Sequence, residues 1–270
     1  MYPDANTLAR DLAFAQDAAR LAGVRALGLS NEKRWEGKML ADVGDQACDG
    51  FLQGFIQGRY PEDGILSEET TDSPERLEKD RCWIVDPLDG TKEYSQLRPD
   101  WAVHVALTFG GNCGVGAVSL PAQGRTLWGI AAPGHEQGGM LGAGEALTGA
   151  SAPPEKLRIA CSRSHTPPWV EAFSSEMDAE LTPAGSVGNK VCMLFTGEAD
   201  LYVHKVGLKE WDTCAPEVIA RALGWHVCKL NGDEHRYNQR NPYNDELVVC
   251  RPAQRERVLT ALANAGALEA

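Results

Sequence analysis

The chain has 270 residues, of which 43% are hydrophobic and 24% charged, a composition typical of globular proteins and not of disordered ones. No apolar run approaches the roughly 18 residues that a membrane-spanning helix needs. The formal net charge of −12 argues against a nucleic-acid polymer as partner, because such partners favour basic surfaces. An acidic chain can still bind a small phosphorylated molecule if bound cations reverse the local field.

The N-terminus and the cysteines indicate the compartment. Residues 1–4 lack the basic region and the apolar core of an export signal. Eight cysteines are scattered without a Cys-x-x-Cys pair, and several lie within apolar runs, as buried free thiols do. We therefore expect a reducing, cytoplasmic location and no disulfide framework.

Two helices are predicted at the start of the chain. Apolar residues recur at helical spacing over residues 7–22, which predicts an amphipathic helix whose role is packing. Residues 31–40 form a polar connection, and a second helix is expected to start near residues 42–45 and to continue to Ile56. Asp45 would then lie in the first turn, where a carboxylate favours the helix dipole, so a structural role is an equal alternative for it.

A short strand over residues 65–66 is predicted to end in two glutamates, Glu68 and Glu69. Two adjacent glutamates usually belong to a solvated loop. Here the next strand follows closely enough for both glutamates to lie beside its end. The charged residues 70–81 predict an exposed loop between the two strands.

The second strand, residues 83–85, continues into the segment Asp86-Pro87-Leu88-Asp89-Gly90-Thr91. Because proline fixes its own φ and glycine permits a tight backbone, we expect the strand to break into a turn at Asp86. A turn can aim the carboxylates of Asp86 and Asp89 and the Leu88 carbonyl at one point, and these hard oxygen ligands suit Mg²⁺. An ordinary surface turn rich in Asp, Pro and Gly is the alternative, and the segment alone favours neither.

An antiparallel meander is predicted next. A helical turn over residues 92–97 precedes three strand-like runs that short turns separate, at residues 101–109, 115–120 and 125–132. The glycine-rich residues 134–149 are assigned to loops, and the stretch at 150–154 is the predicted domain boundary. We therefore expect a metal-binding α+β domain over residues 1–152 and an α/β substrate-side domain over residues 153–270.

The second half of the chain alternates between strands and helices, which is typical of an α/β fold and places loops and helix N-termini along one sheet edge. Strands are predicted at residues 157–161, 181–184, 199–204, 225–230 and 246–250. Helices are predicted at residues 167–177, 186–195, 213–223 and 255–265. Asp212 is expected at or near the N-cap of the third of these helices, which is also a sufficient structural reason for it.

Three motifs together resemble the inositol-monophosphatase superfamily of Mg²⁺-dependent, lithium-sensitive phosphatases. They are Ser67-Glu68-Glu69, the segment from Asp86 to Thr91, and Trp211-Asp212 followed by Ala215. Within the superfamily the chain is most similar to the CysQ-type 3′(2′),5′-bisphosphate nucleotidases. That similarity rests on Val43-Gly44-Asp45-Gln46-Ala47 and Lys92-Glu93-Tyr94, and on a tail, residues 236–243, that resembles actinobacterial members. The resemblance implies an α/β fold of the layered αβαβα sandwich type.

The resemblance also implies two to three Mg²⁺ ions held by acidic residues. Glu68, Asp86 and the Leu88 carbonyl would hold one ion. Asp86, Asp89 and Asp212 would hold a second, so that Asp86 bridges the two ions.

A third, weaker ion is implied at Glu68, with Asp45 in its outer shell. Asp45 and Thr91 would orient the attacking water, and Glu68 would take part in catalysis through the ion that it binds. Direct attack of water on the phosphate needs no covalent phosphoenzyme.

The substrate side is implied by the same resemblance. The expected contacts are Gly90, Thr91, Ser162, His165, Gly185, Ser186, Lys190 and Asp212. His204 stands where some relatives have an arginine, so the contact to a second phosphate need not be the same here. His165 and His204 are equally well explained as an ordinary loop residue and a strand-end residue.

The expected reaction is hydrolysis of the 3′-phosphate of 3′-phosphoadenosine 5′-phosphate to AMP and phosphate, which removes a by-product of sulfate assimilation. Inositol-1-monophosphatase or fructose-1,6-bisphosphatase activity is the alternative within the class. A non-catalytic metal-binding regulatory protein on the same scaffold and a glycosidase that uses paired carboxylates are alternatives from other classes. The expected partner is a small phosphorylated nucleotide, with no nucleic-acid polymer and no membrane, and a homodimer is left open.

Overall fold

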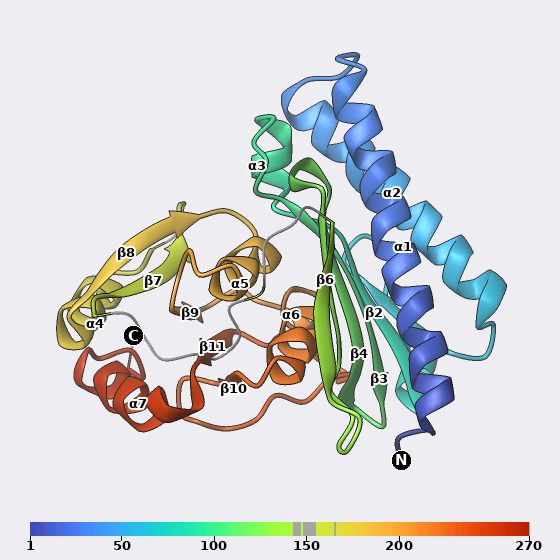
Figure 1. Cartoon of the computed structure of the whole chain (residues 1–270). Helices are drawn as coiled ribbons and strands as arrows, with labels where there is room; N and C mark the ends of the chain where they lie inside the picture. The colour runs from blue at the N-terminus through green and yellow to red at the C-terminus, as the bar shows by residue number, and fades with distance from the viewer. Residues whose placement is uncertain (143–146, 148–154, 165, 270) are drawn as a thin grey trace.

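The computed structural model describes residues 1–142, 147, 155–164 and 166–269. These residues form layers in the order helix, sheet, helix, sheet, helix (Figure 1). The outer helices on one side are α1 (Ala5–Asn31) and α2 (Gly37–Arg59). Between the sheets lie α5 (Val187–Phe195) and α6 (Glu210–Ala222), and the far sheet is covered by α4 (Trp169–Met177) and α7 (Arg255–Asn264). The predicted layered α/β sandwich is confirmed.

The first sheet has the strand order β1-β2-β3-β4-β5-β6, in which only β1 and β2 are parallel. Its strands are β1 (Gly64–Ser67), β2 (Arg81–Asp89), β3 (Ala102–Phe109), β4 (Asn112–Leu120), β5 (Arg125–Ile130) and β6 (Gln137–Gly142). The 3-10 helix η1 (Pro74–Glu78) lies between β1 and β2, and α3 (Thr91–Ser95) follows β2. The predicted meander is therefore confirmed.

The second sheet has the strand order β10-β11-β9-β7-β8. Its strands are β7 (Leu157–Ser162), β8 (Ala179–Ala184), β9 (Leu201–Lys205), β10 (His226–Cys228) and β11 (Glu246–Cys250). β7 is parallel to β8 and to β9, as α/β alternation requires, whereas β11 and β10 add to the edge as antiparallel strands.

Alternation along β2 explains how the first sheet is buried on both faces. Trp83 and Val85 belong to the hydrophobic cluster under α1 and α2, whereas Cys82 and Ile84 belong to the cluster that contains α5 and α6. Successive side chains of a strand point to opposite faces, so Asp86 continues the face of Ile84. The sheet therefore directs its first acidic side chain toward the central helices.

Both N-terminal helices are longer than predicted. α1 continues to Asn31. Gly23 does not end the helix but allows Pro121 to pack closely against it, since a Cβ at Gly23 would lie 2.4 Å from the Pro121 Cγ. α2 begins at Gly37, and an exposed Lys38–Asp42 ion pair of 2.7 Å spans its first turns. The prediction that Asp45 lies in a first turn is therefore wrong, since Asp45 lies in the helix interior.

Two further predictions need correction. β2 does not stop at Asp86 but continues to Asp89, with a shift of register against β3 between these two residues. The glycine-rich stretch contains strand β6, in which Gly138 approaches Leu223 and Gly139 approaches the Trp128 ring. A glycine there permits close packing and does not signal a loop. The predicted domain boundary at 150–154 lies outside the described residues.

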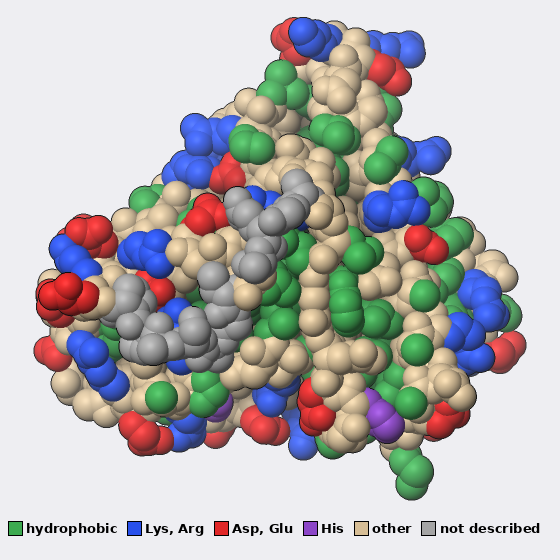
Figure 2. All heavy atoms as spheres, viewed as in Figure 1, with side chains coloured by type: hydrophobic (Ala, Val, Ile, Leu, Met, Phe, Trp, Pro, Cys, Tyr) green, Lys and Arg blue, Asp and Glu red, His purple; other side chains and the backbone are tan. Residues whose placement is uncertain are grey.

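All eight cysteines are buried and free, whereas the sequence indicated burial for several of them. No helix within the described ranges has the length and apolar content to cross a bilayer. On the face shown in Figure 2, basic and acidic side chains are interspersed along the edges and do not gather into a patch of one sign.

A buried ionic network fixes α6, the central helix. The Glu217 carboxylate accepts from the Tyr237 hydroxyl at 2.7 Å and from Arg221 Nε at 2.7 Å, and it lies 2.7 Å from His235 Nδ1. Burial alone would raise the pKa of Glu217, but His235, Arg221 and Tyr237 together lower it to about 2. The ionised carboxylate is therefore a stabilising group of the fold.

Replacing Glu217 by glutamine is expected to destabilise the protein by about 3–5 kcal/mol, since it removes a buried charge that is paired with Arg221 and bonded to Tyr237. The native pKa lies below the usual value of 4.5, so this stabilisation is complete above about pH 4.5 and is lost as the pH falls toward 2. Urea unfolding of both proteins from pH 7 to pH 3 measures it. Glu180→Gln, which removes an exposed partner of Lys156, should change little at any pH. A constant difference between wild type and Glu217→Gln over this range would contradict the assignment.

Candidate metal centre

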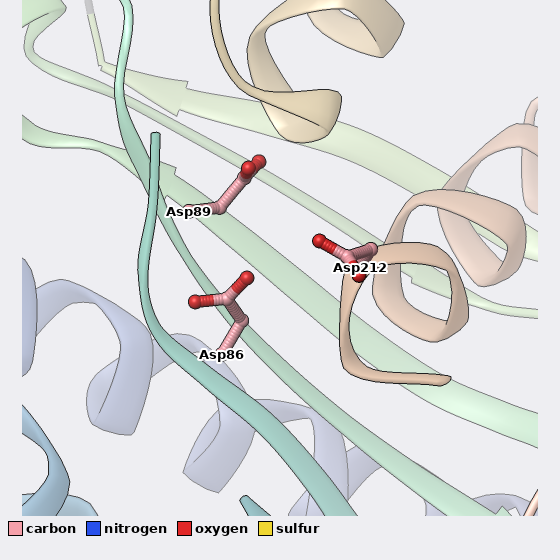
Figure 3. Close-up of side chains that lie close together, drawn as sticks. All are labelled: Asp86, Asp89 and Asp212. Atoms are coloured by element: carbon pink, nitrogen blue, oxygen red, sulfur yellow. The ribbon is translucent and has the colours of Figure 1, made fainter. Parts of the chain in front are cut away.

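Three carboxylates from two distant parts of the chain meet between the first sheet and the central helices. Asp86, Asp89 and Asp212 each offer one oxygen, and these three oxygens lie within 4.8 Å of one another. Figure 3 shows the side chains of Asp86 and Asp89 extending from β2 into the space beside the start of α6, where Asp212 lies. Three anionic groups at this separation repel one another strongly unless protons or cations lie between them.

The irregular end of β2 positions the first two carboxylates. The Leu88 N–H donates to Asp86 Oδ1 at 3.0 Å, which folds the chain back on itself after Asp86. Gly90 has φ +90°, a conformation that favours glycine, and it starts α3. The Thr91 hydroxyl donates to the Leu88 carbonyl at 3.1 Å. The predicted metal ligands and Thr91 therefore form one local unit.

Asp212 reaches the cluster from the first turn of α6. It is the third residue of the helix, whose N-cap is Lys209, so it lies near the N-cap as predicted. The Asp212 carboxylate accepts the Lys209 N–H at 2.7 Å, which holds one of its oxygens against the helix start.

Asp89 is fixed by three groups that all contact its Oδ2. The Ser186 hydroxyl donates to it at 2.5 Å, the Gly188 N–H donates at 2.8 Å, and His104 Nε2 lies 3.0 Å away. Burial would raise the pKa of Asp89, but His104, Lys190 and Ser186 lower it to about 2. His104 and Gly188 were not among the predicted site residues, and the only signal for His104 was a polar residue within an apolar strand.

The pKa values of the other two carboxylates, Asp86 and Asp212, are raised and not lowered. Burial, followed by repulsion from Glu68, Asp89 and Asp212, raises the pKa of Asp86 well above its usual value. Burial and Asp89 raise the pKa of Asp212 to about 7. Such groups ionise at neutral pH when a divalent cation supplies the missing positive charge, and oxygen donors of this kind suit Mg²⁺. The residues present therefore fit a divalent metal ion.

Two more acidic residues lie at the rim of this cluster. In the register of β1 with β2, Ser67 pairs with Val85, so Glu68 follows at the level of Asp86. Although the Glu68 side chain is exposed at the surface, desolvation and the nearby Glu69 and Asp89 raise its pKa.

Asp45 faces the same rim from the interior of α2. Burial and the charges of Glu69 and Glu68 raise the pKa of Asp45 to about 8. Glu68 thus lies near Asp86 and Asp45 lies near Glu68, although neither belongs to the group of three.

Several of the predicted substrate residues lie around the start of α5. Ser186 is the N-cap of α5, and its hydroxyl accepts the Asn189 N–H while it donates to Asp89. The buried Lys190 donates to the Ser186 carbonyl at 2.6 Å. Ser162 and His204 line one small pocket beside β7 and β9. His165 lies outside the described residues.

A second network that the sequence did not indicate fixes the loop before α5. The Gly185 N–H donates to Asp100 Oδ2 at 2.9 Å, and Arg163 donates to the same oxygen at 2.5 Å. Arg163 also contacts Glu93 at 3.1 Å, and a Cβ at Gly185 would lie 2.4 Å from Glu93 carbons. Gly185 therefore has no room for a side chain.

Comparison with known proteins agrees with this geometry. The model of the inositol monophosphatase family matches residues 8–267. A protein of Mycobacterium leprae named 3′-phosphoadenosine 5′-phosphate phosphatase is 36% identical over 252 residues, which cover 89% of this chain and 89% of that protein. The 3′(2′),5′-bisphosphate nucleotidase 1 of Mus musculus is 35% identical over 175 residues, covering 60% of this chain and 54% of that protein.

Solved structures share the fold. CysQ from Bacteroides thetaiotaomicron has a TM-score of 0.79 at 24% identity and covers 90% of this chain and 97% of its own. An inositol monophosphatase from Anabaena has a TM-score of 0.79 at 19% identity, with 96% and 97% covered.

An αβαβα sandwich with a buried carboxylate cluster at the meeting of a strand end and a helix start defines a metal-dependent class of protein. The chain belongs to the inositol monophosphatase family.

Proposed function

We propose that this protein is a Mg²⁺-dependent phosphatase that hydrolyses the 3′-phosphate of 3′-phosphoadenosine 5′-phosphate to give AMP and phosphate. The observation that carries the proposal is the convergence of Asp86, Asp89 and Asp212 in a chain that is 36% identical, over 89% of its length, to a phosphatase of that name.

Mg²⁺ ions are held by the acidic cluster in this proposal. Glu68, Asp86 and the Leu88 carbonyl hold one ion, and Asp86, Asp89 and Asp212 hold a second. Bound Mg²⁺ supplies positive charge that neutralises the phosphate oxygens and lowers the pKa of water. The raised pKa of Asp86 supports this assignment, because the site lacks positive charge of its own at that carboxylate.

The remaining acidic and hydroxyl groups orient water and phosphate. Asp45 and Thr91 orient the attacking water in this proposal, and Glu68 helps to hold a third, weaker ion with Asp45 in its outer shell. The Thr91 hydroxyl lies beside the Leu88 carbonyl, within the same local unit as the metal ligands, which supports its role.

The nucleotide lies against the second sheet and α5. Gly90, Gly185, Ser186 and Lys190 surround the phosphate, and Ser162 and His204 lie toward the rest of the nucleotide. Supporting this placement, Ser186 contacts the metal ligand Asp89 directly.

Phosphate release from three substrates at matched Mg²⁺ tests the proposal. We expect the highest catalytic efficiency with 3′-phosphoadenosine 5′-phosphate, lower values with inositol 1-phosphate and fructose 1,6-bisphosphate, and loss of all activity in EDTA with recovery when Mg²⁺ is restored. Preference for inositol phosphate would overturn the nucleotide assignment. Binding of Mg²⁺ without phosphate release from any substrate would indicate a regulatory protein, and glycoside hydrolysis that resists EDTA would indicate a paired-carboxylate glycosidase.

A further inference from the structure

We propose that His104 is a positioning residue that locks the Asp89 carboxylate to the start of α6 and thereby sets the affinity of the centre for divalent cations. The inference rests on the proposed metal role of Asp89 and Asp212. It concerns a residue of β3 that offers no ligand to the carboxylate cluster itself.

His104 joins the two elements that carry the cluster. On β3 it is the cross-strand partner of Asp86, so both side chains point toward the central helices. Its ring is fully buried, with Nε2 3.0 Å from Asp89 Oδ2 and Nδ1 3.1 Å from the Trp211 carbonyl oxygen. Trp211 immediately precedes Asp212, so one imidazole ring spans the distance between β2 and the first turn of α6.

The contact decides which oxygen of Asp89 is available. His104, Ser186 and Gly188 all contact Oδ2, so the positions around that oxygen are taken by protein groups. Oδ1 makes no comparable contact among the described residues and is the atom left for a cation. A carboxylate held in this way presents one oxygen in a fixed direction, and the loss of such an outer contact typically lowers metal affinity roughly 10–100-fold.

The ring has no freedom to turn away. Gly188, in the first turn of α5, packs against it so closely that a Cβ at this position would lie 2.4 Å from His104 Nε2. The same Cβ would lie 2.7 Å from a Val118 methyl group and 3.1 Å from the Ala102 Cβ. Gly188→Ala is therefore a second way to displace the ring, which leaves the histidine in the sequence.

The experiment measures Mg²⁺ binding by calorimetry in substrate-free protein stripped of metal. We expect His104→Asn, whose shorter side chain misses both partners, to weaken Mg²⁺ binding roughly 10–100-fold. His104→Gln, which keeps a donor of nearly the original reach, should lose less, and Gly188→Ala should resemble His104→Asn.

His235→Asn is the matched control. His235 is also buried, with Nδ1 2.7 Å from a carboxylate oxygen of Glu217 and Nε2 2.7 Å from the Glu246 carbonyl, but it has no contact with the acidic cluster. Its replacement should lower the unfolding midpoint as much as His104→Asn does and leave Mg²⁺ affinity within about 3-fold of wild type, far below the loss expected for an outer-contact residue.

Three results would overturn the inference. One is wild-type Mg²⁺ affinity in a folded His104→Asn or Gly188→Ala protein. A small loss in His104→Gln agrees with the inference only if the other two variants lose much more. Another is an equal loss in His235→Asn, which would indicate a general effect of lower stability. Finally, wild-type protein that binds no Mg²⁺ would remove the proposed function together with the inference, whereas normal binding in wild type and variants alike removes the inference alone.

Discussion

Replacing Asp89 by asparagine is expected to lower the rate of phosphate release by roughly 10³-fold. The substitution removes one charged ligand from a metal centre that stabilises the transition state by several kcal/mol. It should also destabilise the metal-free protein. His104, Lys190 and Ser186 hold the pKa of Asp89 at about 2, so the fold favours its ionised form by about 2 kcal/mol at neutral pH. The substitution leaves those groups without their anionic partner.

Activity and stability are measured separately for Asp89→Asn. Phosphate release in Mg²⁺ reports the first, and urea unfolding in EDTA reports the second. Asp200→Asn is the matched control, since Asp200, which immediately precedes β9, is a buried carboxylate paired with Arg158 at 2.9 Å and Arg251 at 3.3 Å. It should lose stability and retain activity per folded molecule. Full activity in Asp89→Asn would mean that the metal centre has been misplaced.

The parts of the centre that the sequence predicted are those whose geometry is local. Asp86 and Asp89 are close in the chain, so the proline and glycine beside them indicated that their carboxylates can meet, although the segment alone did not separate a metal site from a surface turn. Asp212 is more than 100 residues away, and no periodicity places it there. It was identified because the Trp211-Asp212 motif resembles a family pattern, which carries tertiary information that a single sequence otherwise lacks.

His104 shows what local reasoning could not find. Its place in an apolar strand predicts only that its ring is buried. The contact with Asp89 depends on the register of β3 with β2, on the shift of that register after Asp86, and on a glycine of α5 that leaves space for the ring. Each of these is fixed by packing between elements, so none has a signal within a short window of sequence.

The errors in the element boundaries have the same origin. Glycine is ambiguous in sequence, since it serves turns and close approaches equally well. Gly23 in α1 and Gly138 and Gly139 in β6 all serve close approaches, to Pro121, Leu223 and Trp128 respectively. The layered architecture was nevertheless predictable, because it depends on the hydrophobic pattern summed over many residues and not on any one glycine.

Replacing Asp86 by asparagine should lower phosphate release as strongly as Asp89→Asn, roughly 10³-fold, but change stability in the opposite direction. Asp86 is buried among acidic groups, and burial, Glu68, Asp89 and Asp212 raise its pKa. Its charge therefore opposes folding in metal-free protein at neutral pH. An asparagine keeps the oxygen that accepts the Leu88 N–H and removes that charge, so the unfolding midpoint in EDTA should rise.

The stabilisation in Asp86→Asn should fade as the pH falls toward about 4, the ordinary value for an aspartate, because below it the wild-type carboxyl is neutral in both folded and unfolded chains. Excess Mg²⁺ should make wild type more stable than Asp86→Asn. Binding at about 100 times the dissociation constant adds about 2.7 kcal/mol to wild type, and Asp86→Asn loses most of this gain. Urea unfolding of both proteins at pH 7 and pH 4.5, with EDTA or with Mg²⁺, gives the four differences in stability that are needed. If Asp86→Asn were less stable than wild type in EDTA at pH 7, the Asp86 charge would be stabilised by the fold itself, and the argument that this cluster requires a cation would be wrong.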